Sequence, residues 1–281
     1  MNLRVVTWNA EGMFVTGSKT RRADRHQALH VVRRLDADIV FVPEFGNVDD
    51  VEPATITALH ALGYQVILYS YAQTELLGSY GAALFTRLPL VSHTLHHFAN
   101  TGRTFIEAYI KPDAASSALR IVGLHLDDRS EELRLEQVTQ VTNILSKSHE
   151  GETIVLGDFN AMHKHSRFAR VARSAIAARF TKTVSRGLVR SMSGRVSEMA
   201  IGSTIEYLLA HTNLHDLDGK HRRTISAKQA GLEWAPALRL AKIDWILGSP
   251  GVASQGYRVH KDVGSDHRPV IADLILKLHK K

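Results

Sequence analysis

The sequence predicts an α+β fold in which strands and helices pack as layers. Runs rich in β-branched residues occur along the whole chain, and some follow one another closely enough to form hairpins. Between several of them, apolar residues recur at helical spacing, which favours mixed layers over a regular strand–helix–strand succession. The chain has 281 residues, 44% of them hydrophobic, and no linker rich in Pro, Gly or Ser divides it. We therefore predict one domain over residues 1–281 with one large core.

Each predicted strand is a short apolar or β-branched run bounded by polar or turn-forming residues. We expect strands at Leu3–Trp8, Asp38–Val42, Tyr64–Tyr69, Gly81–Thr86, Thr104–Ile110, Leu119–Leu124, Thr153–Leu156, Lys242–Leu247 and Val270–Leu276. Each predicted helix has apolar residues every three or four positions. We expect helices at Arg21–Leu35, Pro53–Leu62, Ser130–Ser146 and Ser166–Phe180. Because the N-terminus enters a strand directly and no apolar run approaches the length of a membrane span, we expect a cytoplasmic protein without a transmembrane segment.

The charge of the chain favours a polyanionic partner. Lys and Arg number 35 against 28 Asp and Glu, and the pI is about 9.7. Residues 161–231 contain 13 Lys and Arg against 4 Asp and Glu, so the excess belongs to this segment, which we interpret as a basic helical insertion. The alternative is a solvated helix surface. Nucleic acid is the expected substrate, peripheral contact with an anionic membrane stays open, and so does the oligomeric state.

Within this segment we predict arginines that bind substrate. On the expected helix Ser166–Phe180, arginines recur on one side and apolar residues on the other. A second basic cluster follows near residue 222. The predicted substrate-binding residues are Arg167, Arg170, Arg173, Arg222 and Arg223. The chain has no cysteine, which excludes disulfides and thiolate metal sites.

An acid and an imidazole stand together where the last predicted strand begins. Ser265, Asp266 and His267 precede the strand Val270–Leu276. An adjacent carboxylate and imidazole at a strand entrance suit chemistry on a metal-bound phosphate, although a Ser-Asp pair is also common in turns. Polar residues likewise stand where other predicted strands stop: Thr7-Trp8-Asn9-Ala10-Glu11-Gly12, Pro43-Glu44-Phe45, Gly157-Asp158-Phe159-Asn160 and Ile243-Asp244-Trp245-Ile246.

Together these segments resemble the endonuclease/exonuclease/phosphatase superfamily of metal-dependent phosphoesterases, over the chain from Asn9 to His267. The resemblance implies a four-layer α/β/β/α sandwich of two packed mixed sheets flanked by helices, as in DNase I. It also implies hydrolysis of phosphate esters with Mg²⁺ or Mn²⁺. Many branches of the superfamily have a His-Leu pair at the position of His125, whereas the abasic-site endonucleases usually have a Tyr there. Ala241 stands where those endonucleases carry a Trp, so an abasic-site repair role is disfavoured.

The metal ligands predicted are Glu44, Asn9 and Asp266. Glu44 directly follows an apolar strand and has no cationic neighbour in sequence, so burying it is costly unless a cation binds it. Asn9 at the end of the first strand could share the ion. A solvent-facing turn Glu and a turn-capping Asn are the alternatives. The resemblance implies that Asp266 is a ligand or supports one, and Pro43 replaces the Gln that usually precedes the metal-binding Glu.

The predicted catalytic residues are His125, Asp158, Asn160, Asp244 and His267. In extended backbone, Asp158 and Asn160 would point to the same side, although an Asx-turn is the alternative. The resemblance assigns water activation to Asp158 and transition-state stabilisation to Asn160. It also implies that Asp244 orients His267, and that His125 donates to phosphate or acts as a general acid. Whether His267 is a base or an electrostatic stabiliser stays open.

We therefore predict a metal-dependent nuclease that hydrolyses DNA or RNA phosphodiesters with an activated water. One alternative is a phosphatase or phosphodiesterase of a small phosphorylated metabolite or lipid headgroup. The other, from a different class, is a non-catalytic nucleic-acid-binding module. The complete set of polar motifs argues against the last.

Overall fold

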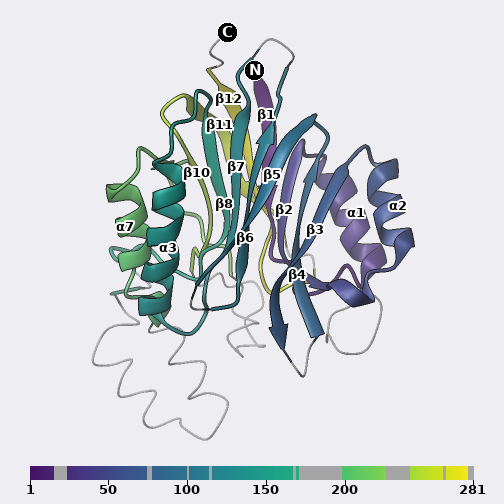
Figure 1. Cartoon of the computed structure of the whole chain (residues 1–281), viewed down its shortest axis with the longest axis horizontal. Helices are drawn as coiled ribbons and strands as arrows, with labels where there is room; N and C mark the ends of the chain where they lie inside the picture. Colours follow the sequence, from purple (N-terminus) through teal and green to yellow (C-terminus); the bar gives the residue numbers. More distant parts are fainter. Residues whose placement is uncertain are drawn as a thin grey trace, which may run out of the picture.

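The computed structural model consists of two six-stranded sheets packed face to face, with helices on both outer faces (Figure 1). It describes residues 1–15, 24–74, 78–99, 101–113, 116–166, 169–170, 198–225, 241–261 and 264–277. The first sheet has the order β11-β12-β1-β2-β4-β3 and the second the order β5-β6-β7-β8-β10-β9. This architecture confirms the predicted α+β four-layer sandwich.

The first sheet contains β1 (Asn2–Thr7), β2 (Ile39–Asn47), β3 (Gln65–Thr74), β4 (Gly78–Thr86), β11 (Val252–Val259) and β12 (Val270–Leu276). The second contains β5 (Leu90–His97), β6 (Thr104–Ile110), β7 (Leu119–His125), β8 (Thr153–Asp158), β9 (His215–Asp216) and β10 (Asp244–Gly248). Each sheet has one parallel pair, β1 with β2 and β7 with β8, and its other strand pairs are antiparallel.

Helices α1 (Arg25–Leu35) and α2 (Pro53–Ala61) cover the first sheet, and α3 (Glu131–Leu145) and α7 (Ser203–Ala210) cover the second (Figure 1). A short 3-10 helix spans Val48–Asp50. The helix starts follow ordinary capping: Asp24 accepts a hydrogen bond from the backbone of Gln27, and Ser130 from that of Leu133. None of the helices in the described part of the chain is long and apolar enough to cross a membrane.

Buried apolar side chains fill the space between the layers. One cluster fills the space between the two sheets, and it includes Phe41, Ile121 and Ile246. A second packs α1 and α2 against the first sheet, and a third packs α3 and α7 against the second. Several buried polar side chains, including Asn9, His125 and Asp158, lie at or directly after strand ends, whereas Glu107 is buried within β6.

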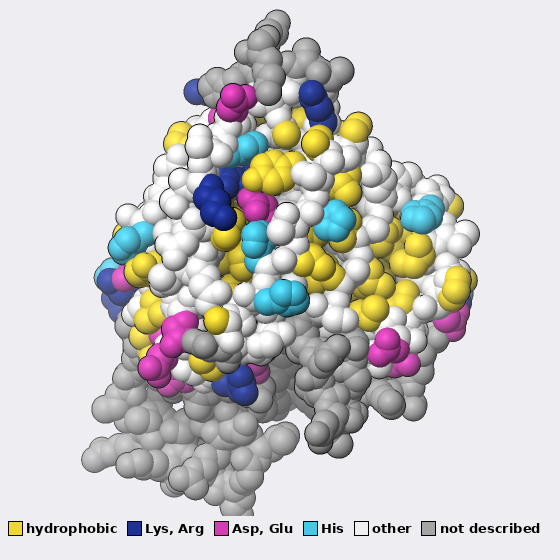
Figure 2. Space-filling view, in the orientation of Figure 1, with side chains coloured by type: hydrophobic (Ala, Val, Ile, Leu, Met, Phe, Trp, Pro, Cys, Tyr) yellow, Lys and Arg dark blue, Asp and Glu magenta, His cyan; other side chains and the backbone are white. Residues whose placement is uncertain are grey.

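Some elements differ from the sequence prediction. Strands β5, β9 and β11 and helix α7 were not predicted. β5 is an edge strand whose side chains are mostly exposed and include three histidines, so it lacks an apolar pattern. Figure 2 shows histidine side chains exposed on the face that carries β5 and β6. Helix α1 begins at Arg25 after its Asp24 cap, and most of the predicted helix Ser166–Phe180 lies outside the described residues.

Candidate active site

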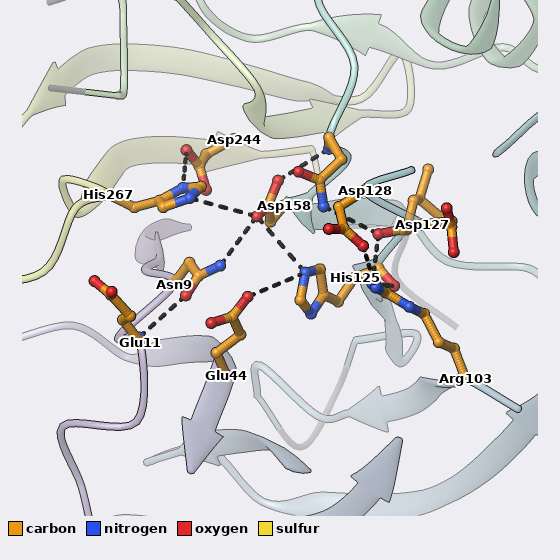
Figure 3. Close-up of polar contacts among 12 residues, drawn as sticks. Asn9, Glu11, Glu44, Arg103, His125, Asp127, Asp128, Asp158, Asp244 and His267 are labelled. Atoms are coloured by element: carbon orange, nitrogen blue, oxygen red, sulfur yellow. Dashed lines mark hydrogen bonds and ion pairs between the residues drawn. The ribbon is translucent and has the colours of Figure 1, made fainter. Parts of the chain in front are cut away.

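The strand register brings the predicted site residues to one edge of the sandwich, opposite the edge where both termini lie (Figure 1). Asp158 ends β8, and it is flanked in register by His125 at the end of parallel β7 and by Asp244 at the start of antiparallel β10. Asn9 follows β1 in the other sheet, and His267 precedes β12, which pairs with β1. Residues separated by more than a hundred positions therefore meet (Figure 3).

Asp158, Asp244 and His267 form a buried cluster that we call the histidine half of the site. His267 Nδ1 lies 3.0 and 2.9 Å from the two carboxylate oxygens of Asp244. Its Nε2 lies 3.7 Å from Asp158 Oδ2. The side chains are only 1%, 1% and 9% exposed. The predicted pairing of Asp244 with His267 is thus present in the structure, with one ring nitrogen held and the other facing Asp158.

The charges of the histidine half shift its pKa values strongly. Burial lowers the pKa of the His267 imidazole, but the carboxylates of Asp244 and Asp158 outweigh burial and hold that pKa well above its usual range. Burial raises the pKa of Asp158 to about 7, while the charge of His267 opposes the increase. His267 is therefore an imidazolium at neutral pH, and Asp158 changes protonation near neutrality.

Asn9, Glu44 and Asp266 form a more open cluster that we call the carboxylate half. The side chains of Glu44 and Asp266 are 26% and 23% exposed. Burial raises the pKa of Glu44, the charge of Asp266 raises it further, and His267 and a hydrogen bond from Asn9 act in the opposite direction. The negative charges of Glu44 and Asp266 therefore repel each other, although Asp266 Oδ1 also lies 3.9 Å from His267 Nε2.

Asn9 and His125 connect the two halves (Figure 3). Asn9 Nδ2 donates to Asp158 Oδ2 at 3.0 Å, and Asn9 Oδ1 accepts from the backbone of Glu11 at 3.1 Å. His125 Nε2 lies 3.6 Å from Glu44 Oε1 and 3.7 Å from Asp158 Oδ2. Burial lowers the pKa of His125 well below its usual value, and the positive charges of Arg103 and His267 lower it further. His125 is thus a neutral imidazole between two carboxylates.

Backbone strain concentrates at this edge. Glu11, Glu44 and Asn160 have φ values of 49°, 51° and 48°, in the left-handed region that non-glycine residues seldom occupy. Gly157 has φ 145°, and a Cβ atom there would approach the carbonyl oxygen of Leu124 to 1.9 Å. Only glycine therefore allows the close approach of β7 and β8 directly before Asp158.

Glu44 lies inside a strand and not at its end. β2 continues to Asn47, and its pairing with β4 shifts register between Val42 and Gly46. Pro43 lies at this irregularity, where it cannot donate a ladder hydrogen bond, and its carbonyl accepts from the backbone of Ala10 at 3.1 Å. The bulged backbone turns the Glu44 side chain toward the site.

The backbone at Asn160 differs from the extended conformation that we predicted. β8 ends at Asp158, and the left-handed backbone of Asn160 rules out the extended spacing that we used to place both side chains on one side. The backbone N–H of Asn160 donates to Asp158 Oδ1 at 2.9 Å, so the Asx-turn alternative is present. Its side-chain Nδ2 donates to the carbonyl of Leu126 at 3.0 Å. Asn160 adjoins the site, and its role in transition-state stabilisation stays a prediction.

The predicted substrate-binding arginines are only partly described. Arg167 and Arg173 lie outside the described residues. Arg170 and Arg223 are exposed. The guanidinium of Arg222 forms an ion pair with buried Asp218 and lies 5.7 Å from the centre of the Tyr257 ring. Arg222 therefore already has a protein partner, and the assignment of these arginines to substrate stays a prediction.

Two residues of the site were missed from the sequence. Tyr80, on β4, donates from its hydroxyl to Glu44 Oε2 at 3.2 Å. Arg103 donates to the carbonyl of Leu126 at 2.6 Å and to Asp128 Oδ1 at 2.8 Å. Both acceptors lie in the turn that follows His125. Neither belongs to a motif that adjoins a recognised catalytic residue in sequence. Only the pairing of β4 with β2 and the turn after β7 bring them to the site.

The residues present fit a divalent cation. Oxygen ligands suit Mg²⁺ and Mn²⁺, and the carboxylate half offers side-chain oxygens of Asn9 and of the partly exposed Glu44 and Asp266. A cation there would stabilise the ionised form of Glu44, whose pKa is raised by burial and then by the charge of Asp266. Asp158, Asp244 and His267 also offer ligand atoms within 4.8 Å of one another. Because His267 already binds Asp244 through Nδ1, we favour the carboxylate half for the cation.

Known structures share this fold. An AP endonuclease from Archaeoglobus fulgidus has 15% sequence identity and a TM-score of 0.65, over 98% of this chain and 99% of that one. A 3'-5' exonuclease from Neisseria meningitidis has 17% identity and a TM-score of 0.62, over 96% and 98%. ANGEL2, a 2',3'-cyclic phosphatase in complex with adenosine-2',3'-vanadate, has 15% identity and a TM-score of 0.66, over 99% and 96%. No curated protein sequence matches the chain significantly.

At these identities the structural likeness shows the fold alone. The family assignment depends on the sequence itself, because a model of the Endonuclease/Exonuclease/phosphatase family matches residues 6–267. That range begins in β1 and ends at His267, so it contains every residue of both halves of the site. The chain is therefore a phosphoesterase-type protein that belongs to the Endonuclease/Exonuclease/phosphatase family.

Proposed function

We propose that this protein is a Mg²⁺- or Mn²⁺-dependent phosphodiesterase that acts as a nuclease on DNA or RNA. The observation that carries the proposal is the convergence of a carboxylate half and a histidine half on Asp158 Oδ2, which faces the side chains of Asn9, His125 and His267. Phosphodiester hydrolysis needs a place for a cation, a group that orients water, and positive charge beside the phosphoryl oxygens. The two halves together offer all of these.

Each residue has a role that its surroundings support. A divalent cation held by Glu44, Asn9 and Asp266 would neutralise phosphoryl oxygens and acidify a bound water. Asp158 would orient the attacking water and accept its proton, since its pKa lies near neutrality. His267, held by Asp244 as an imidazolium, would stabilise negative charge on the phosphate. Neutral His125 would hydrogen-bond the phosphate or the leaving oxygen.

The preference for nucleic acid over a small phosphate ester is supported by charge. Residues 161–231 contain 13 Lys and Arg against 4 Asp and Glu, and Arg170 and Arg223 are exposed. The AP endonuclease and the exonuclease that share the fold also act on nucleic acid, as their names state. For this chain, His125 and Ala241 disfavour the abasic-site role. A nuclease of broader specificity is the function that these features favour.

A substrate panel tests the proposal. Single- and double-stranded DNA, RNA, inositol phosphates, sphingomyelin and bis-p-nitrophenyl phosphate are incubated with Mg²⁺, Mn²⁺ or EDTA. We expect cleavage of at least one nucleic acid with either metal and none in EDTA. Turnover of only the small esters would replace the nuclease by a small-molecule phosphodiesterase. Binding of oligonucleotides without any metal-dependent turnover would instead support a non-catalytic module.

A second experiment separates polymer contacts from the chemistry. Each phosphate contact releases counterions, so the logarithm of affinity should fall with the logarithm of salt by about 0.7 to 0.9 for each contact. Charge reversal of Arg167, Arg170 and Arg173 should flatten this slope and slow oligonucleotide cleavage, while bis-p-nitrophenyl phosphate hydrolysis serves as the control and stays nearly unchanged. An unaltered salt slope would mean that these arginines are only a solvated surface.

A further inference from the structure

A fully buried threonine connects the two segments that carry the Asp244–His267 pair. Thr224 belongs to the segment Asp216–Ile225, which we call the strap because it crosses the start of β10 and the turn before β12. Thr224 Oγ1 accepts the backbone N–H of Ile243 at 3.2 Å and that of Asp244 at 3.3 Å. The same residue therefore holds the backbone from which the Asp244 carboxylate extends.

The strap also holds the segment of His267. The carbonyl of Thr224 accepts the backbone N–H of Arg268 at 3.0 Å. Ile225 forms an antiparallel bridge with His267. The side-chain hydroxyl and the backbone carbonyl of Thr224 thus bond to the backbone on both sides of the Asp–His pair, where Nδ1 and the carboxylate lie 2.9 Å apart.

Buried charges anchor the other end of the strap beneath β10. Lys242 Nζ lies 2.8 Å from both carboxylate oxygens of Asp216 and 3.5 Å from Asp218, and 4.2 Å from the centre of the Trp245 ring. Asp218, which is fully buried, also pairs with Arg222. Because Lys242 stands two residues before Asp244, this ionic cluster keeps the strap in place beside the catalytic backbone.

We propose that Thr224 is a positioning residue for the Asp244–His267 pair, and that its hydroxyl sets the distance between the carboxylate and the imidazole. The inference relies on the proposed phosphodiesterase function for its kinetic consequence, but its geometric content is independent of that function. Without Oγ1, the N–H groups of Ile243 and Asp244 would lose their acceptor inside the protein. The start of β10 would then shift, and the carboxylate with it.

Three variants test this role. Thr224→Val removes the hydroxyl at constant shape, and Thr224→Ser restores it. Thr86→Val is the matched control, because Thr86 is also fully buried and its Oγ1 accepts from the backbone of Leu88 at 3.0 Å. Thr86 pairs with Ile39, which is the first residue of β2, whereas Glu44 lies toward the other end of that strand. Should Thr224→Val not fold, Thr224→Ala removes the same hydroxyl and replaces it in the comparison.

Kinetics are measured with bis-p-nitrophenyl phosphate at saturating Mg²⁺, on variants whose folding has been checked by thermal melting. We expect Thr224→Val to lower kcat about 10- to 100-fold with KM little changed. Thr224→Ser should recover most of the loss, and Thr86→Val should lose stability but keep its kcat. Wild-type kcat in folded Thr224→Val, or an equal loss in Thr86→Val, would overturn the inference.

Proton NMR of the His267 Nδ1–H, which is hydrogen-bonded to Asp244, distinguishes this inference from the proposed function. We expect its downfield signal to move or broaden in Thr224→Val and to be retained in Thr224→Ser and Thr86→Val. If the wild type hydrolyses no phosphodiester but the signal behaves in this way, the proposed function fails and the positioning role stands. An unchanged signal in Thr224→Val would overturn the positioning role whatever the activity.

Discussion

The two halves of the site differ in how their charges are compensated. In the histidine half, an imidazolium lies between the carboxylates of Asp244 and Asp158, and all of these side chains are at least nine-tenths buried. In the carboxylate half, Glu44 and Asp266 are about one quarter exposed, and burial, followed by the charge of Asp266, raises the pKa of Glu44. In the histidine half the counter-charge is the imidazolium of His267, whereas in the carboxylate half it would be a bound cation.

The histidine half is therefore held in place by its own ion pairs, whereas the carboxylate half has the features of a cation-binding site. Removing one partner of a buried ion pair destabilises the protein, because the remaining charge is left uncompensated. A carboxylate near another carboxylate is instead stabilised by neutralisation or by a bound cation. Asp244→Asn and Glu44→Gln should therefore have opposite effects on the stability of the metal-free protein, although both should impair catalysis.

The largest expected effect is on turnover. Asp158→Asn and His267→Ala should each lower kcat by about 10²- to 10⁴-fold, because each removes a proton-transfer or charge-stabilising group. The double variant should lose far less than the product of both losses, since the two groups act on one transition state. Circular dichroism must first show that the variants fold. A near-normal rate in either single variant would place the chemistry elsewhere.

The next effect contrasts the stability of the two halves. In metal-free protein, Asp244→Asn should cost about 3–5 kcal/mol, because it leaves the buried imidazolium of His267 without its closest counter-charge. Glu44→Gln should leave the free energy of unfolding unchanged or raise it, because it removes one of two like charges. Urea unfolding in EDTA measures both.

Asp36→Asn provides the matched control for that comparison. Asp36 pairs with Arg87 at 2.5 Å, but its side chain is 67% exposed, so the substitution should cost less than about 1 kcal/mol. If Glu44→Gln were as destabilising as Asp244→Asn, the contrast between the two halves would be lost.

The smallest expected effect is the pH dependence of stability. The folded-state pKa of His267 is raised above 6.5, so its contribution is complete below pH 6.5 and is lost as the pH rises through the folded-state value. The pKa of Asp158 is raised from 3.8 to about 7, so its ionisation also lowers stability as the pH rises toward 7. The lowered pKa of His125 acts in the opposite direction, and this contribution fades as the pH rises above 6.5.

Metal-free protein should therefore lose stability between pH 6.5 and 8, by at most about 1.4 kcal/mol per pH unit for each group. Thermal melting in EDTA across this range measures the slope. Asp158→Asn should reduce it, since one of the two groups no longer titrates. A melting temperature that rises over the same interval would contradict the charge assignment of the histidine half.

The fold was largely predictable because the strands that position the site are apolar and buried. The predicted strands Leu3–Trp8, Leu119–Leu124 and Thr153–Leu156 correspond to β1, β7 and β8 in the sheets. β5 escaped prediction because an exposed edge strand has no reason to be apolar, and β9 because it has only two residues. Helix α7 escaped because its residues fall within the segment that we treated only as a basic insertion.

The site residues next to strand ends were predictable for the same reason. The remaining residues were not, because their positions depend on a local turn or on tertiary contacts. At Asn160 the assumed extended backbone is wrong and the Asx-turn alternative is present, while the role of the residue stays a prediction. Tyr80, Arg103 and Thr224 act through contacts across strands or turns, so no spacing along the sequence identifies them. Arg222 matched a basic cluster, but the structure pairs it with Asp218.

The most direct test of the account is a Mg²⁺ titration of bis-p-nitrophenyl phosphate hydrolysis by wild-type protein, Glu44→Gln and Asp36→Asn. We predict no hydrolysis in EDTA, a saturable increase with Mg²⁺ in wild type and Asp36→Asn, and a clearly higher half-saturating Mg²⁺ concentration in Glu44→Gln, because a neutral amide is a poorer ligand for a hard cation. Full wild-type hydrolysis in EDTA, or the same half-saturating concentration in Glu44→Gln and wild type, would contradict the assignment of the cation to the carboxylate half.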